Sequence, residues 1–180
     1  RFVNTNGAAS VSGAIDAMTD IPFAQLATAQ SHSNIKVLES PGGGWLPLCM
    51  AVDMAPFDNV NVRKAMRLIV DRPAMLAQVL SGHGRVANDL YGIFDPAYNH
   101  ALPQRTQDIE KAKSLFKAAG KDGATFELNT TDGATGMVES AQVFAQQAKA
   151  AGITINVNKL DGSTFYGTQY LKWTFSSDFW

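Results

Sequence analysis

Cysteine is almost absent from the sequence, in which Cys49 is the single cysteine among 180 residues. A lone cysteine cannot form an internal disulfide, so no disulfide framework stabilises the fold. Because Cys49 lies between Leu48 and Met50, we expect a buried, unreactive thiol rather than a nucleophile. One thiol does not decide the redox compartment in which the protein works.

The sequence also lacks an excess of charge and a long hydrophobic run. Fifteen basic and sixteen acidic residues give a net charge of −1. This balance excludes a global field that would attract nucleic acid or an anionic membrane. No apolar run approaches the length of a membrane span. The chain begins with Arg1 and nothing there resembles a signal peptide, so either its start has been removed or it is a piece of a longer protein.

Common enzyme and metal motifs are missing as well. The histidines, His32, His83 and His100, lie far apart, and no G-x-S-x-G motif is present. The segment "GHGRVA" (82–87) fits a loose dinucleotide fingerprint, but a helix is expected before it and a loop after it, which does not suit pyrophosphate binding. We therefore expect no catalytic residue, no metal site and no cofactor.

What is present is a globular composition, 46% apolar and 17% charged, with a clear helix pattern from Met54 to Arg72. Asp58 and Asn59 can cap this helix, and Arg63, Lys64 and Arg67 are expected on its outer face. Its predicted core stripe consists of Val62, Ala65, Met66, Ile69 and Val70.

A second helix is predicted directly after the first. Asp71 can cap it, and Pro73 is tolerated in its first turn. Its predicted buried side consists of Met75, Leu76, Val79 and Leu80. A helix-turn-helix DNA-binding unit is a weak alternative, because the second helix lacks polar side chains that read bases.

The rest of the chain predicts an α/β fold with a mixed sheet flanked by helices. Residues 7–31 are loosely helical, and residues 83–106 form a long ordered loop. Pro47 indicates an edge strand or a bulge. Strands are predicted at 35–40, 45–52, 124–130 and 153–160, helices at 108–120 and between 136 and 152, and a short helix and a strand in the tail.

This succession of motifs resembles the family 5 extracellular solute-binding proteins of bacterial ABC importers, the dipeptide, oligopeptide and nickel-binding group. The resemblance covers about residues 35–180, and "SGAIDA" (12–17) is also similar to a family segment. The family motifs are matched by "PFDNVNVRKAMRLIVDRPAMLAQVLSG" (56–82), "FDPAYN" (94–99), "DIEKAKSLFKAAG" (108–120), "FELNTTD" (126–132) and "VFAQQAKAAGITINVNKLDGSTF" (143–165).

The resemblance implies one lobe of a two-lobed, periplasmic binding protein-like clamp. Residues 1–180 would form a single partial lobe without an internal domain boundary, which pairs with the missing lobe of its own chain. The implied function is capture of a peptide-like or related small solute at the periplasmic or extracellular face of the membrane, and its delivery to ABC permease subunits. The alternative is a small stand-alone α/β enzyme or regulatory domain with an unrecognised site.

The resemblance also implies ligand-binding residues. These are the loop after the strand "FELNT" (Thr130, Thr131, Asp132 and Gly133), the segment around Asp161, and Trp180. In peptide-binding relatives the carboxylate that grips the peptide's amino group lies a few residues later, so we expect it beyond Trp180. Because ligands of open α/β sheets bind beyond the carboxyl ends of the strands, we expect "FELNT" and "TFSSDFW" to end side by side.

Overall fold

The computed structural model describes residues 15–19 and 21–180. Its centre is a four-stranded sheet in the order β1-β4-β2-β3. Strand β2 runs parallel to β3 and β4, whereas β1 pairs antiparallel with β4 at one edge. The strands are β1 (Leu48–Met50), β2 (Thr125–Thr130), β3 (Thr154–Lys159) and β4 (Phe175–Ser177). The predicted α/β fold with a mixed sheet is confirmed, and the edge position of β1 agrees with Pro47 before it.

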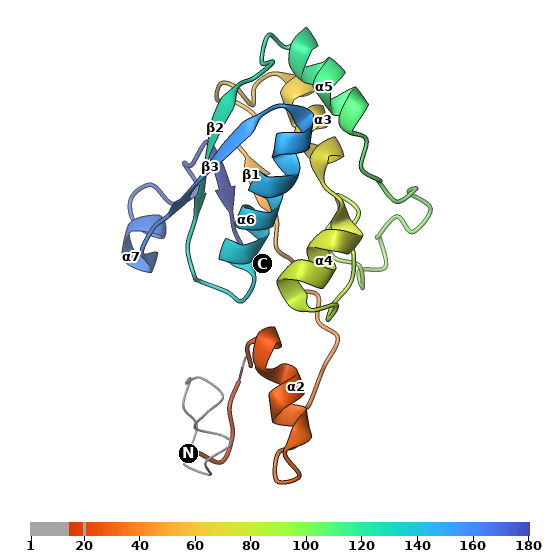
Figure 1. The fold of residues 1–180 in the computed structure, drawn as a ribbon, viewed down its shortest axis with the longest axis vertical. Helices are drawn as coiled ribbons and strands as arrows, with labels where there is room; N and C mark the ends of the chain where they lie inside the picture. Colours follow the sequence, from red (N-terminus) through yellow and green to blue (C-terminus); the bar gives the residue numbers. More distant parts are fainter. Residues whose placement is uncertain (1–14, 20) are drawn as a thin grey trace.

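The helices pack mainly on one side of this sheet (Figure 1). Helix α6 contacts β2, β3 and β4, while α3 packs against α5. Aromatic rings fill the core between them: the ring centroids of Phe57 and Phe175 are 5.0 Å apart, and those of Phe144 and Phe175 are 6.0 Å apart. The helices are α2 (Phe23–Ser31), α3 (Val60–Ile69), α4 (Arg72–Leu80), α5 (Ile109–Ala118), α6 (Met137–Ala148) and α7 (Gly162–Phe165), with a 3₁₀ turn η1 (Lys149–Ala151) after α6.

Helix α3 confirms most of the predicted pattern. The side chain of Asn59 accepts a hydrogen bond from the Asn61 amide at 2.9 Å, so it is the N-cap. The predicted stripe is buried except for Val70, which is half-buried. The expectation that Arg63 and Arg67 face solvent is wrong, because both are half-buried. Arg63 donates to the Phe57 carbonyl at 2.5 Å, and Arg67 lies 3.8 Å from the Asp89 carboxylate.

Helix α4 is less enclosed than predicted. Asp71 caps it by accepting a hydrogen bond from the Ala74 amide at 3.0 Å, as expected. Its apolar residues Met75, Leu76, Val79 and Leu80 are only half-buried, so the prediction of a fully buried side is wrong. The reason is its position at the margin of the helix layer, where its main helix contact is α6.

Residues 35–40 do not form the predicted strand. They belong to an extended connection that leads from α2 to β1, and Leu38 is 81% exposed there. Figure 1 shows α2 below the sheet, joined to the rest of the molecule by this connection. One side-chain contact across the gap is the stacking of Phe23 on His83, with ring centroids 5.5 Å apart. The similarity at 12–17 and the predicted helix at 7–31 lie partly outside the described residues.

The long loop 83–106 is ordered by its own polar contacts, as predicted. Asn88 donates to the carbonyls of Leu102 and Pro103, both at 3.0 Å, and accepts from the Arg105 amide at 2.8 Å. Asp89 forms ion pairs with Arg72 and Arg105. The predicted elements after this loop are confirmed, including the Asp108 cap of α5. The division into lobes stays a prediction.

Candidate functional site

The carboxyl ends of β2 and β4 lie side by side, as the sequence predicted. Asn129 of β2 is opposite Ser176 of β4 in the parallel register. One residue further, the Ser177 hydroxyl donates to the Thr130 hydroxyl oxygen at 2.6 Å, and both side chains are buried. This end of the sheet faces α2 in Figure 1, and we call it the carboxyl edge.

Thr131 continues β2 into the carboxyl edge. It has 0% of its surface exposed, and its hydroxyl oxygen has no hydrogen-bond partner within the described part of the chain. Buried hydroxyl groups are normally hydrogen-bonded, so an unpaired one calls for an explanation. The Thr131 hydroxyl is therefore available for a further hydrogen bond at this edge, whereas the Thr130 hydroxyl already accepts one from Ser177.

Asp132 and Gly133 form the exposed start of the loop before α6. Asp132 pairs with Lys159 at 3.0 Å, and this hydrogen bond and the lysine charge lower the pKa of the Asp132 carboxyl. A Cβ atom at Gly133 would lie 2.3 Å from the Tyr166 hydroxyl oxygen. Only glycine therefore lets Tyr166 lie directly against this loop.

Asp161 is engaged in capping α7. Its carboxylate accepts from the Thr164 amide at 2.9 Å and from the hydroxyl groups of Ser163 and Thr164. These hydrogen bonds hold the pKa of Asp161 far below its usual value, and the bond from Ser163 has the largest effect. Its oxygens therefore serve the local structure.

An aromatic cluster follows Asp161 in the sequence. Phe165 is fully buried and stacks on Trp173, with ring centroids 6.0 Å apart. The Trp173 indole donates to the Phe165 carbonyl at 3.2 Å. Tyr166 meets Tyr170 edge-on at 5.0 Å. The cluster fixes the position of Tyr166 beside Gly133.

Asp178 is a further candidate site residue, which the sequence analysis did not name individually. It follows β4 directly and is 4% exposed, and its carboxylate accepts from the Phe179 amide at 2.9 Å. Burial, the charge of Asp178 and a hydrogen bond with it raise the pKa of Tyr170; burial and then the same charge raise the pKa of Tyr166. An acidic residue directly after a buried strand was the sequence signal that could have identified it.

Cys49 lies on the exposed side of β1, so the expectation of a buried thiol is wrong. Strand β1 is at the sheet edge and its alternate residues face away from the core. Partial burial, and to a smaller extent the charge of Asp178, raise the pKa of the Cys49 thiol above its ordinary value of 9.0. The thiol is therefore protonated near neutral pH and weakly nucleophilic, as expected.

Trp180 also lies at the carboxyl edge, with 59% of its surface exposed. Its amide donates to the Trp45 carbonyl at 3.1 Å, and its carbonyl accepts from the Trp45 amide at 2.9 Å. These bonds extend the antiparallel pairing of β1 and β4 beyond the strands. The structure thus brings Thr130, Thr131 and Trp180 to one edge, and places Asp132 and Gly133 in the adjoining loop.

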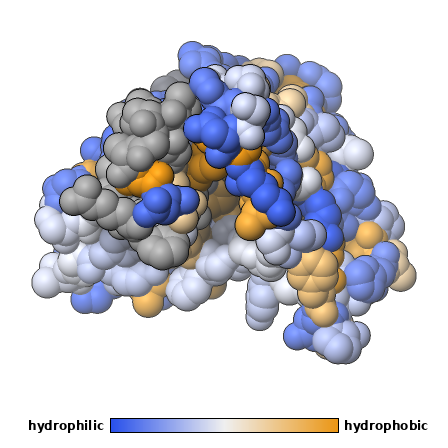
Figure 2. Space-filling view, turned by 90° about the horizontal axis from the view of Figure 1, so that it is seen from below, coloured by the Kyte–Doolittle hydropathy of each residue, from blue (hydrophilic) through white to orange (hydrophobic). Residues whose placement is uncertain are grey.

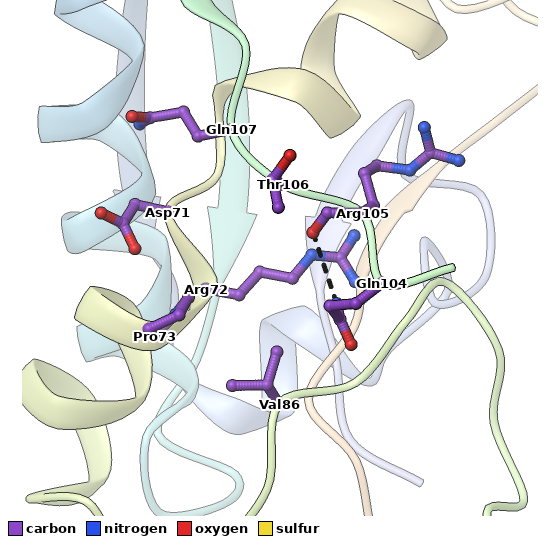
Figure 3. A pocket seen from close by; sticks show the side chains of 8 residues that line it. All are labelled: Asp71, Arg72, Pro73, Val86, Gln104, Arg105, Thr106 and Gln107. Atoms are coloured by element: carbon purple, nitrogen blue, oxygen red, sulfur yellow. Dashed lines mark hydrogen bonds between the residues drawn. The ribbon is translucent and has the colours of Figure 1, made fainter. Parts of the chain in front are cut away.

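A separate pocket of about 440 Å³ lies between the start of α4 and residues 104–107 (Figure 3). In the figure the side chain of Arg72 crosses the space between Asp71 and Gln104. Burial opposes ionisation of the neighbouring Asp89, but hydrogen bonds and charge from Arg105 and Arg72 lower its pKa overall. The pocket contains none of the predicted site residues. Residues 15–19 and 21–180 hold no group of three or more His, Cys, Asp or Glu side chains suited to a metal ion.

Comparison with known proteins places the fold in a family. Residues 3–179 match the sequence family described as "Bacterial extracellular solute-binding proteins, family 5 Middle". The glutathione-binding protein GsiB of Escherichia coli O1:K1 / APEC is 29% identical over 161 residues, which cover 88% of this chain and 31% of GsiB. The chain therefore spans about a third of the length of this relative.

Solved structures share the fold at lower identity. DppA of Helicobacter pylori, in complex with the peptide STSA, superposes with a TM-score of 0.84 at 22% identity, covering 96% of this chain and 34% of DppA. NikA of Staphylococcus aureus, in complex with Ni(L-His)2, superposes with a TM-score of 0.80 at 24% identity, covering 94% of this chain and 37% of NikA. None of the helices in the described part of the chain is long and apolar enough to cross a bilayer.

Proposed function

Because the chain belongs to the bacterial extracellular solute-binding proteins of family 5, we propose that it supplies part of the solute-contacting face of an ABC importer's binding protein. The solute would meet the carboxyl edge of the sheet and be enclosed when a second lobe closes over it. The complete protein would work at the periplasmic or extracellular face of the membrane and pass the solute to permease subunits.

The observation that supports this proposal best is the Thr131 hydroxyl, which has no hydrogen-bond partner among residues 15–19 and 21–180. It is fully buried at the carboxyl edge, where open α/β sheets bind ligands. A hydroxyl can donate one hydrogen bond and accept others. Because the Thr131 hydroxyl is fully buried, it would pair with the amide or carboxylate groups of a solute only after the structure around it opens. Tyr166, which lies against Gly133, adds a second hydroxyl near the same loop.

A peptide-like solute fits this mixture of groups. Amide and carboxylate groups of such a solute match the hydroxyls, and the ion pair of Asp132 and Lys159 presents both charges at the exposed rim. GsiB is a glutathione-binding protein and DppA was solved with the peptide STSA, so both solutes are reasonable probes. Because NikA was solved with Ni(L-His)2, small metal complexes are a second class of solute to test with this chain.

Binding without catalysis is the role that we propose. The relatives named above are binding proteins, and the raised pKa of the Cys49 thiol makes it a poor nucleophile. The tyrosines near Asp178 also have raised pKa values, so neither is prepared to act as a base near neutral pH. A stand-alone enzyme would need a reactive group other than the Cys49 thiol and these tyrosines.

Replacement of Thr131 tests the proposal. We expect Thr131→Val to weaken the binding of glutathione or the peptide Ser-Thr-Ser-Ala by up to about ten-fold, because a neutral hydrogen bond contributes about 0.5–1.5 kcal/mol. The measurement is an NMR titration of the 180-residue chain, which reads millimolar dissociation constants.

The matched control is Thr125→Val. Thr125 begins β2, at the opposite end of the same strand, and is exposed. It should leave the affinity unchanged. Equal affinities for wild type and Thr131→Val would contradict the assignment of Thr131, and chemical-shift changes with neither solute would contradict the choice of peptide-like solutes.

A further inference from the structure

We propose that Tyr91 and Phe94, in the loop 83–106, are specificity-determining residues that hold an apolar or aromatic side group of the solute. This inference rests on the proposed function and names the solute class more closely. It assigns a role to a loop in which the sequence analysis named no candidate binding residue.

The first step is that distant segments meet beside Trp180. The connection that leads to β1 passes close to Phe94 and to Trp180. A Cβ atom at Gly43 would lie 3.9 Å from the Phe94 ring, and one at Gly44 would lie 3.5 Å from the Trp180 carbonyl oxygen. Trp45, the next residue, stacks on Tyr91 with ring centroids 5.5 Å apart and an interplanar angle of 22°.

These contacts form one continuous surface, which we call the aromatic strip: Trp45, Tyr91, Phe94 and Trp180. The backbone bonds between Trp45 and Trp180 join it to the carboxyl edge, where Thr131 lies. Figure 2, seen from below relative to Figure 1, shows hydrophobic residues in a hollow near the centre of this face, bordered by hydrophilic ones. The strip is therefore contiguous with the proposed solute face.

The second step is the exposure of these rings. Tyr91 is 73% exposed, Phe94 is 57% exposed and Trp180 is 59% exposed. Contiguous exposed apolar surface on a soluble protein marks a binding site, and small-molecule sites are lined mainly by apolar and aromatic side chains. Because the strip adjoins the solute face, the occupant that we assign to it is a side group of the solute.

The third step concerns charge. The Arg85 guanidinium lies over the Phe94 ring, 4.5 Å from its centroid, a cation–π contact that orients the ring. It also places a positive charge beside the strip. Solutes whose apolar group neighbours a carboxylate are thus favoured over those whose apolar group neighbours an ammonium group.

Two tripeptides that differ only in the central side chain test the inference. We expect the 180-residue chain to bind Gly-Phe-Gly about two- to ten-fold more tightly than Gly-Ala-Gly, the range expected of one aromatic contact. The double variant Tyr91→Ala/Phe94→Ala should remove this preference, so that it binds the two peptides with equal affinity. Affinities are measured by NMR titration, which reads millimolar dissociation constants.

The control variant is Val52→Ala. Val52 is 63% exposed and follows β1, which runs antiparallel to β4 and therefore ends away from the carboxyl edge. It should keep the preference for Gly-Phe-Gly. Thermal unfolding of the double variant should match wild type, because both side chains are largely exposed.

The outcomes separate the two claims. Equal binding of both peptides by wild type overturns the inference and leaves the proposed function standing. Binding of neither peptide overturns the proposed function, and the inference with it. A double variant that unfolds at a clearly lower temperature would show that the aromatic strip is structural, and would also overturn the inference.

Discussion

At the residue scale, Asp89 joins the loop 83–106 to the helix layer through arginine side chains. Its carboxylate pairs with Arg72 of α4 and with Arg105, and Arg67 of α3 lies 3.8 Å away. The Asp89 side chain is only 15% exposed, so solvent screens these bonds little. Arg72 is 17 positions from Asp89 in the sequence and Arg105 is 16 positions from it, so Asp89 holds distant parts of the chain together.

We expect Asp89→Asn to lower the free energy of unfolding by about 1–3 kcal/mol, because hydrogen bonds to charged groups contribute about 1.5–3 kcal/mol. The measurement is urea unfolding at neutral pH. The control is Asp122→Asn, an exposed residue in the turn before β2, which should change little. Equal losses in both variants would contradict the role of Asp89.

The comparison of wild type with Asp89→Asn also gives a prediction for the pH dependence of stability. The folded-state pKa of Asp89 lies below its ordinary value of 3.8, so its stabilisation is present above that value and is lost as the pH falls through the lowered pKa. The difference in unfolding free energy between wild type and Asp89→Asn should therefore persist from neutral pH to about pH 5 and shrink in stronger acid. A difference that grows on acidification would contradict this account.

The sequence predicted residues whose partners are local, and it missed those whose partners are distant. Asn59, Asp71 and Asp108 cap helices through amides two or three residues away, so the sequence pattern contains the whole interaction. Thr130 bonds to Ser177, which is 47 positions away. The burial of Thr131 and Asp178 follows from that pairing of strands. The sequence predicted that the two strands end side by side, but not how deeply these two side chains are buried there.

At the element scale, the apolar stripe of α3 is almost completely enclosed. We expect Met66→Ala to lower the free energy of unfolding by about 2–5 kcal/mol, because Met66 is 2% exposed and its removal leaves a cavity in the core. Thermal or urea unfolding measures the change. Lys64→Ala, on the exposed side of the same helix, is the control and should have almost no effect. An unchanged melting curve for Met66→Ala would contradict the packing of α3.

Two segments show why sequence periodicity alone does not fully predict which elements form and how deeply they are buried. The run "IKVLES" has the composition of a strand, but it lies in the extended connection from α2 to β1 and pairs with no strand of the described sheet. Helix α4 has the predicted apolar residues, yet its main helix contact is α6, so they remain half-buried. In both cases the outcome depends on which partner is available.

At the scale of the whole molecule, the chain spans 31% of the length of GsiB. A small-molecule site typically encloses about 70–90% of its ligand's surface, and a single face covers about half. We therefore expect this chain alone to bind a peptide-like solute with a dissociation constant no tighter than about millimolar, against micromolar or tighter for an intact clamp.

The central claim is that solute meets the carboxyl edge of the sheet, and amide chemical-shift mapping tests it most directly. An isotopically labelled 180-residue chain is titrated with the peptide Ser-Thr-Ser-Ala. We predict that the shifts which saturate at millimolar peptide gather at residues 130–133 and 178–180, on the two strand ends joined by the bond between Ser177 and Thr130. Shifts gathered instead around residues 71–73 and 104–107, at the pocket of Figure 3, would contradict the claim.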